Sequence, residues 1–224
     1  MKKIYLLLLL GLSIWACRNT GTEPETGYDY FPLEKGNYVI YDVTQIDYVI
    51  NQNPDTSRFQ IKERVGDSFT ALDGLMSYRI ERYRRESEQQ VWAFDSLWTA
   101  RRAIDRAVRT ENNVSFVKLI FPARNGQTWN PNILNTQDSL RSIILNEGEP
   151  VTIGTQTFDK TLTVQVQNKQ TLTDSIIHKE VYAKTIGLIQ SDITRVVTCI
   201  PDCAVSKISY GIKYKQRIVS HGKE

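Results

Sequence analysis

Histidine, cysteine and catalytic motifs are scarce in this sequence. The chain has two histidines and three cysteines, and neither His178 nor His221 lies in HExxH or a comparable metal-binding spacing. The GxSxG elbow, the P-loop and the GxGxxG fingerprint are absent. Dispersed acids such as Asp138 and Asp159 are as typical of turns as of general acids. We therefore expect no enzyme activity, cofactor or metal site, and we interpret both histidines as solvated. A hydrolase would need two carboxylates that converge in a cleft.

A strong excess of charge is missing too. The chain has 28 basic and 25 acidic residues; without residues 1–16, which contain Lys2 and Lys3 and no acid, 26 and 25 remain. Proteins that bind nucleic acids concentrate basic residues on one surface, so nucleic acid is not an expected partner. The length suits one domain with a single sizeable core.

The N-terminus has the layout of a secretory signal, which we assign to residues 1–16. Two lysines precede an apolar run from Ile4 to Leu12, and a short segment then ends in the small residue Ala16. The run is too short for a spanning helix, which needs about 20 apolar residues. We therefore expect this segment to be cleaved.

Cys17 follows the signal directly. Residues 14–17, Ile-Trp-Ala-Cys, resemble the lipobox of bacterial lipoproteins, in which the cysteine receives diacylglycerol and begins the mature chain. The resemblance implies a membrane anchor through acyl chains such as palmitate on Cys17. Arg18 stands where an Asp would indicate inner-membrane retention, which favours the outer membrane, on its periplasmic face or at the cell surface. The alternative is a plain secreted protein with a free or paired Cys17.

The remaining cysteines, Cys199 and Cys203, form an even pair in an oxidising compartment. Because Pro201 and Asp202 between them favour a turn, we predict a disulfide across that turn. A redox motif would more often have two intervening residues, and a zinc site would need further ligands. Such a short ring would contribute about 2 kcal/mol or less and tether a loop.

Alternation of apolar and polar residues predicts a mainly β fold. Residues 17–27 are polar with Gly and Pro, as in a flexible tether, and residues 28–224 are expected to form a single mostly β domain. Alternation is clear at 39–43, 161–167 and 207–214 and indicates antiparallel strands packed on one face. The predicted fold class is a curved antiparallel sheet or partial barrel with few short helices. Further strands are predicted over 57–65, 76–85, 89–95, 114–121, 151–157 and 186–198.

Two segments have mixed patterns. Over 95–110, Leu97, Ala100 and Ile104 fall at helical spacing, whereas the flanking aromatic residues alternate as in a strand. A strand pair and a short helix are therefore both open there. Residues 138–146 are compatible with a turn of helix.

Several short motifs follow one another along the chain. Tyr30-Phe31-Pro32-Leu33 is followed by Gly36-Asn37-Tyr38 and Tyr41. The later landmarks are Phe121-Pro122, Gly126, Trp129, Gly154, Phe158, residues 181–184, residues 186–189 and Tyr210-Gly211. This order resembles a large group of uncharacterised bacterial envelope lipoproteins with the opening YFPL..GN.W.Y and a later YAK.IGLI. The resemblance implies an antiparallel β protein tethered to an outer membrane, with no catalytic residues to transfer.

Two sets of residues are candidates for binding. Arginines that could meet lipid phosphates or an acidic partner form a possible basic patch: Arg82, Arg84, Arg101 and Arg102. Acids are interspersed among them, so a mixed solvent face is the favoured interpretation. Possible ligand or partner aromatics are Trp92, Trp98 and Trp129. Large aromatics are more often part of a core.

The leading hypothesis is a non-catalytic, lipid-anchored envelope lipoprotein that binds an apolar or lipid-like ligand. The alternative is a structural or assembly subunit that docks another envelope protein and has no ligand pocket. An apolar pocket of roughly 300 Å³ or more favours ligand binding, and a filled core favours docking.

Overall fold

A computed structural model describes residues 25–200 and 205–224 of the chain. Apart from one turn of 3-10 helix, every regular element in these ranges is a strand. The elements are η1 (Tyr28–Tyr30), β1 (Asn37–Tyr48), β2 (Asp55–Thr70), β3 (Met76–Arg85), β4 (Ala93–Arg102), β5 (Arg106–Glu111), β6 (Val114–Ile120), β7 (Thr128–Trp129), β8 (Ser142–Ile153), β9 (Gln156–Gln170), β10 (Asp174–Ala183), β11 (Gly187–Thr198) and β12 (Ile208–Lys223). Within the same ranges, no helix has the length and apolar character needed to cross a membrane.

The strands form one 12-stranded antiparallel sheet in the order β6-β5-β4-β3-β2-β1-β12-β11-β10-β9-β8-β7. Two meanders, β1 to β6 and β7 to β12, are each built from consecutive strands. The pairing of β1 with β12 joins them in the middle of the sheet, with Asn37 opposite Lys223 and Tyr48 opposite Gly211. The first and last strands of the chain are therefore neighbours.

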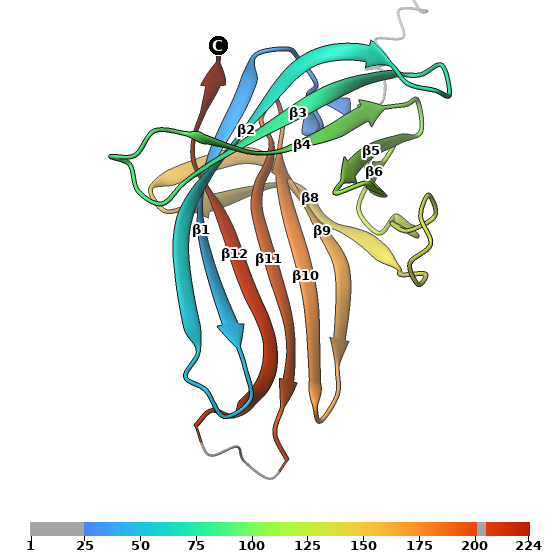
Figure 1. Cartoon of the computed structure of the whole chain (residues 1–224). Coiled ribbons are helices and arrows are strands. Elements are labelled where there is room, and N and C mark those ends of the chain that lie inside the picture. Colours follow the sequence, from blue (N-terminus) through green and yellow to red (C-terminus); the bar gives the residue numbers. More distant parts are fainter. Residues whose placement is uncertain (1–24, 201–204) are drawn as a thin grey trace, which may run out of the picture.

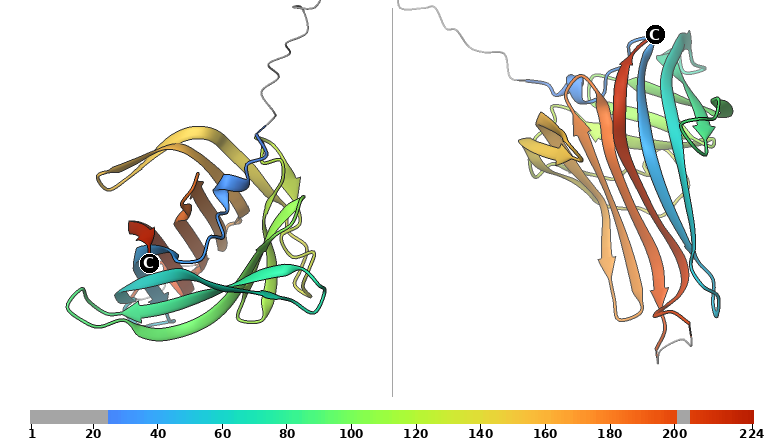
Figure 2. Two further views of the ribbon diagram at one scale, coloured as in Figure 1. Left: turned by 90° about the horizontal axis from the view of Figure 1, so that it is seen from above. Right: turned by 90° about the vertical axis from the view of Figure 1, so that its left-hand side faces the viewer.

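The two edges of the sheet meet and nearly close it into a barrel, as Figure 2 shows from above. The backbone N–H of Val117 in β6 donates a hydrogen bond to Pro131 O at 2.9 Å, just beyond β7. The indole N–H of Trp129 in β7 donates to Val117 O at 2.8 Å. We call these contacts the seam. The predicted fold class, a curved antiparallel sheet or partial barrel, is confirmed.

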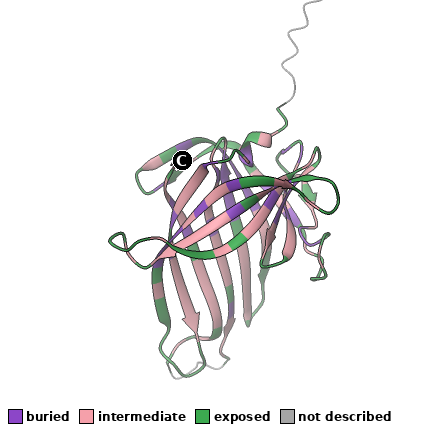
Figure 3. Ribbon diagram, turned by 45° about the horizontal axis from the view of Figure 1, so that its top comes forward, coloured by how far each residue is buried: buried purple, intermediate pink, exposed green. Residues whose placement is uncertain are grey.

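The barrel occupies the upper part of the molecule in Figure 1, at the end that carries the C-terminus. Below it, β1, β2, β12, β11, β10 and β9 continue together as a curved blade (Figure 1). Buried residues concentrate in the barrel, and the lower ends of the long strands are mostly intermediate or exposed (Figure 3). The apolar core therefore lies inside the barrel and beside the lid described below.

Two clusters of buried side chains make up this core. The first contains Tyr30, Leu119, Ile144 and Leu162, each fully buried, with Trp98 and Trp129 packed against it. The second contains apolar side chains of β1 and β2 and of the β8–β9 hairpin: Tyr41, Val43, Phe59, Ile61, Ile153 and Phe158. Burying such side chains contributes roughly 1.5–3 kcal/mol each, so the inward positions of the strands determine the register.

Several strand predictions are confirmed and others are wrong. Residues 57–65, 76–85, 114–121 and 186–198 fall in β2, β3, β6 and β11. The mixed segment 95–110 forms a strand pair, because Trp98 and Ala100 of β4 and Ala107 of β5 point into the barrel core.

The helical turn at 138–146 is wrong. Ser142 and Ile144 are fully buried and Ile143 between them is not, which is the period of the strand β8. The range 151–157 is interrupted by a turn at Gly154, whose φ is +58°. In the range 89–95, the strand begins only at Ala93, after a turn in which Gln90 N–H bonds Ser87 O at 3.1 Å.

Candidate functional site

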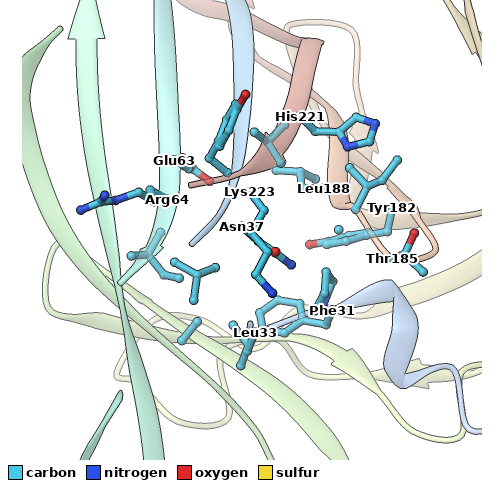
Figure 4. Close-up of a pocket in the computed structure, with 18 of the residues that line it drawn as sticks. Phe31, Leu33, Asn37, Glu63, Arg64, Tyr182, Thr185, Leu188, His221 and Lys223 are labelled. Atoms are coloured by element: carbon cyan, nitrogen blue, oxygen red, sulfur yellow. The ribbon is translucent and has the colours of Figure 1, made fainter. Parts of the chain in front are cut away.

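A mostly apolar cavity of about 380 Å³ opens inside the upper end of the barrel. We call it the upper cavity. Its wall includes Val65, Ile80 and Ala100 from one side of the barrel and Leu188 from the other. Figure 4 shows Phe31, Leu33, Tyr182 and Leu188 gathered around this space, while the Arg64 side chain extends away from it. An unfilled apolar space of this size is typical of small-molecule sites.

Residues 28–36 form a lid segment across the upper end of the barrel (Figure 2). Its buried residues Tyr30 and Phe31 face the core. Backbone hydrogen bonds fix both ends: Thr185 N–H donates to Asp29 O at 2.7 Å and Gly36 N–H donates to Val65 O at 2.8 Å. The guanidinium of Arg102 donates to Phe31 O at 3.3 Å. The Tyr-Phe-Pro-Leu motif is therefore the lid of the upper cavity.

Charged side chains form a buried ion network at the floor of this cavity. Glu63 of β2 accepts hydrogen bonds from Arg82 of β3 at 3.0 Å and from Arg109 of β5 at 2.5 Å. All three side chains are at most 12% exposed. Arg82 and Arg109 also lie over the ring of Trp98, 3.8 and 4.6 Å from its centroid. Glu63 and the indole of Trp98 thus contact both guanidinium groups, and Arg82 also bonds Asp95 at 3.2 Å.

The network continues on the opposite wall. Lys118 of β6 donates to Glu180 of β10 at 2.5 Å, and its Nζ is 3.5 Å from a carboxylate oxygen of Glu111. Tyr182 O–H donates to the other Glu180 oxygen at 2.6 Å. His178 Nε2 lies 3.2 Å from Glu180. Strands from both meanders therefore meet in the lumen through charge pairs.

The pairing keeps the buried carboxylates ionised. Burial alone would raise the pKa of Glu63, but Arg109 and then Arg82 hold it below its ordinary value. Burial opposes ionisation of Glu180 as well, and Lys118 and His178 hold its pKa far below the usual range. The pKa of Lys118 is raised despite burial, because Glu111 and Glu180 face it. Burial raises the pKa of Tyr214, in the same lumen, to about 12.

Two further cavities adjoin the ion network. The lower cavity, about 340 Å³, lies in the lumen beneath it and shares Glu63, Arg109 and Leu188 with the upper cavity. A side cavity of about 370 Å³ lies between the β5–β6 hairpin, the loop before β8 and strands β9 to β11. The lower and side cavities share Lys118, Glu180 and other network residues. The network thus lies between the upper cavity and the lower and side cavities.

The carboxylates of Glu63, Glu111 and Glu180 converge in the lumen, but their environment does not suit a general acid. Glu63 and Glu180 have lowered pKa values and are bound to cations, whereas a general acid needs a carboxyl that stays protonated near the working pH. In residues 25–200 and 205–224, no group of three or more His, Cys, Asp and Glu side chains is arranged to hold a metal. The arrangement is suited to binding and to structural pairing.

The three predicted tryptophans do not converge. Trp98 lines the lower cavity between Arg82 and Arg109. Trp129 is at the seam and packs on the first core cluster. Trp92 is half-buried beneath Arg85, whose guanidinium is 4.2 Å from its ring centroid. Only Trp98 is placed to contact a ligand in the lumen.

The predicted basic patch is divided among different partners. Arg82 belongs to the ion network, and Arg84 lies over the Phe59 ring at 3.6 Å while bonding Glu86. Arg101 pairs with Asp73, and Arg102 bonds the lid segment. These arginines stabilise the fold rather than presenting one basic surface.

The prediction that both histidines are solvated is wrong for His178. Its side chain is 14% exposed and faces Glu180 inside the lumen. His221 is exposed, as predicted, but it lies in β12 opposite Val39 at the rim of the upper cavity.

Sequence reasoning missed the ion network as a unit. The available signal was the two-residue periodicity of a strand. Glu63 follows Phe59 and Ile61 at intervals of two, so its side chain faces the core with theirs. In the same way Glu180 alternates with the buried Tyr182. A charged residue in phase with apolar neighbours indicates a buried pair whose partner comes from another strand.

Several predictions concern residues outside the described ranges. They are the signal over 1–16, most of the tether over 17–27, lipidation of Cys17, and Cys203 of the predicted disulfide. Cys199 itself follows β11, and its N–H donates to Lys207 O at 3.0 Å.

No protein-family model matches the chain, and no curated protein sequence matches it. Among solved structures, it is similar to the crystal structure of a "putative exported protein with YmcC-like fold" from Bacteroides fragilis. The identity is 10%, the TM-score is 0.41, and the match covers 86% of this chain and 98% of that one.

Proposed function

We propose that the chain is a non-catalytic cell-envelope lipoprotein that holds an apolar or lipid-like ligand in the upper cavity. The observation that carries this proposal is the cavity itself: about 380 Å³, mostly apolar and covered by the lid segment. Its volume lies within the range of about 300–1,000 Å³ typical of ligand sites. A subunit that only docks a partner has no use for an unfilled apolar chamber, which costs packing energy.

The anchoring part of the proposal rests on the sequence. An acylated Cys17 would fix the protein to the outer membrane, and more than one acyl chain makes such binding stable. A Cys17→Ala variant is expected to lose acyl mass and to leave the membrane fraction. A variant that kept both would overturn this part. We also propose the Cys199–Cys203 disulfide, which would make the intact mass two hydrogens lighter than that of the reduced chain.

Ligand binding is tested by native mass spectrometry and solvent extraction of the protein purified from its own envelope. We expect a discrete apolar compound in wild type. Ala100 is buried and lines the upper cavity, so Ala100→Leu adds volume there and should reduce occupancy. The matched control is Ala93→Leu, an exposed alanine of the same strand β4 that lines none of the three cavities.

A wild-type protein without ligand, which also fails to bind an added fluorescent fatty acid, would overturn the binding proposal. It would favour the alternative, a structural or assembly subunit whose surface docks another envelope protein. Equal occupancy in Ala100→Leu and Ala93→Leu would place the ligand outside the upper cavity.

A further inference from the structure

One cation in the wall of the lower cavity has no acidic partner among the described residues. Four cationic side chains line it: Arg82, Arg109, Lys118 and Arg195. The acids that line it are Glu63, Glu111 and Glu180. The wall thus holds four cations and three acids, and Asp95, which does not line it, pairs with Arg82 at 3.2 Å.

Arg195 is the cation that remains without an acidic partner. Arg82 and Arg109 pair with Glu63, and Lys118 pairs with Glu180. No acid of the described part of the chain lies within ion-pair distance of Arg195, an exposed residue of β11 that lines both the lower and the side cavities. Arg195 thus borders both cavities, and no described side chain pairs with its guanidinium.

A second observation points to the same kind of ligand group. Arg109 is 8% exposed, and its Nε–H has no hydrogen-bond acceptor. A carboxylate oxygen of Glu111 lies 3.5 Å from Nε and does not complete the bond. A buried donor without an acceptor is costly, typically by about 1–3 kcal/mol. Arg109 lines both the upper and the lower cavity, so a bound acceptor would lie between the apolar chamber and Arg195.

We infer that the ligand is an anionic amphiphile, with a single apolar chain in the upper cavity and a carboxylate or phosphate head in the lower cavity, near Arg109 and Arg195. This inference rests on the proposed function and specifies its ligand class. The upper cavity is near the small end of ligand-site volumes, which fits one chain. Guanidinium groups bind carboxylate and phosphate oxygens in pairs, and a partly buried site strengthens such bonds.

The test uses the mature lipoprotein held in phosphatidylcholine nanodiscs. Two probes are compared: a photo-crosslinkable palmitate and a photo-crosslinkable monopalmitoylglycerol with the same reactive group on the chain. Mass spectrometry measures the labelled fraction and maps the labelled peptides. We expect the acid to label residues 28–36 with at least about tenfold higher affinity than the neutral probe, as expected for one charge-assisted bond.

Arg195→Gln should remove most of this preference and leave labelling by the neutral probe unchanged. Its matched control is Arg58→Gln, an exposed β2 arginine without an ion pair among the described residues that lines none of the three cavities. Competition by palmitate against lysophosphatidic acid then shows whether a carboxylate or a phosphate head is preferred.

Equal labelling by both probes in wild type, or an unchanged preference in Arg195→Gln, would overturn the inference and leave the proposed apolar site intact. If neither probe labels the lumen, the proposed function fails as well. The two failures are therefore distinguishable.

Discussion

At the scale of single residues, Glu63 shows why the site differs from the sequence-based picture. Glu63 alternates with Phe59 and Ile61 along β2, so the sequence alone predicts that its side chain points inward. The ion-pair partners of Glu63 cannot be predicted from the sequence, because Arg109 comes from β5 and is only one of several arginines between residues 79 and 109. His178 was misassigned for the same reason: its neighbours in sequence are charged, but its neighbours in space are Glu180 and the lumen.

Acid pH is expected to destabilise the protein through the ion network. In the folded state the pKa values of Glu63 and Glu180 are lowered, whereas the unfolded chain has ordinary carboxyls with pKa about 4.3. The stabilisation is thus fully present above that unfolded value and is lost progressively as pH falls below it. Urea unfolding between pH 7 and pH 3 should show this decrease.

The control variant is Glu180→Gln. At pH 7 it should lower the free energy of unfolding by about 3–5 kcal/mol, because it leaves Lys118 buried without its main partner. It should also lose less stability than wild type on acidification. Glu88→Gln, at an exposed glutamate, should behave like wild type. An acid dependence that is identical in Glu180→Gln and wild type would contradict the assignment.

At the scale of elements, the sequence predicted strands well where one face is apolar and poorly where turns interrupt a pattern. Gly154 divides an apparently continuous strand into β8 and β9 because it has positive φ. Residues 138–146 were misassigned because Ser142 is a polar residue at a fully buried strand position. Tertiary packing determines both outcomes, and local propensity alone does not.

Strand β12 requires a glycine at position 211, and the Tyr-Gly motif does not by itself explain why. Its φ is +130°, and a Cβ there would lie 2.1 Å from Arg195 O on β11. Gly211→Ala should therefore lower the free energy of unfolding by roughly 2–4 kcal/mol, from backbone strain plus overpacking. Chemical denaturation measures the difference.

The comparison for Gly211 is Gly154→Ala. Gly154 also has positive φ, but an added Cβ would meet nothing within 4 Å. Strain alone should cost about 1–2 kcal/mol there. Equal losses in the two variants would show that the close approach of β11 to β12 is unimportant.

At the scale of the whole molecule, curvature of the sheet was predictable but its closure was not. The seam depends on Val117 and Trp129, which belong to the two edge strands. Nothing local in either strand indicates that they meet. The cavities follow from closure, so their existence required the structure.

Trp129→Phe tests the seam. Phenylalanine keeps the aromatic packing and removes the N–H that donates to Val117 O at 2.8 Å. We expect a loss of about 1 kcal/mol and faster amide hydrogen exchange in β6 and β7, with β1 and β12 unchanged. Trp92→Phe, away from the seam, should leave exchange unaltered. Unchanged exchange at the seam in Trp129→Phe would show that other contacts close the barrel.

The pairing of β1 with β12 also sets the order in which the molecule is completed. The ribosome synthesises β1 first and β12 last, so Asn37 can pair with Lys223 only when the chain is almost complete. Long-range pairing of this kind is slow, because a large loop must close first. Until then β1 lacks one of its two neighbouring strands, and the sheet cannot close into a barrel. If the chain crosses a membrane pore with its N-terminus first, the barrel therefore cannot close until almost the whole chain has emerged.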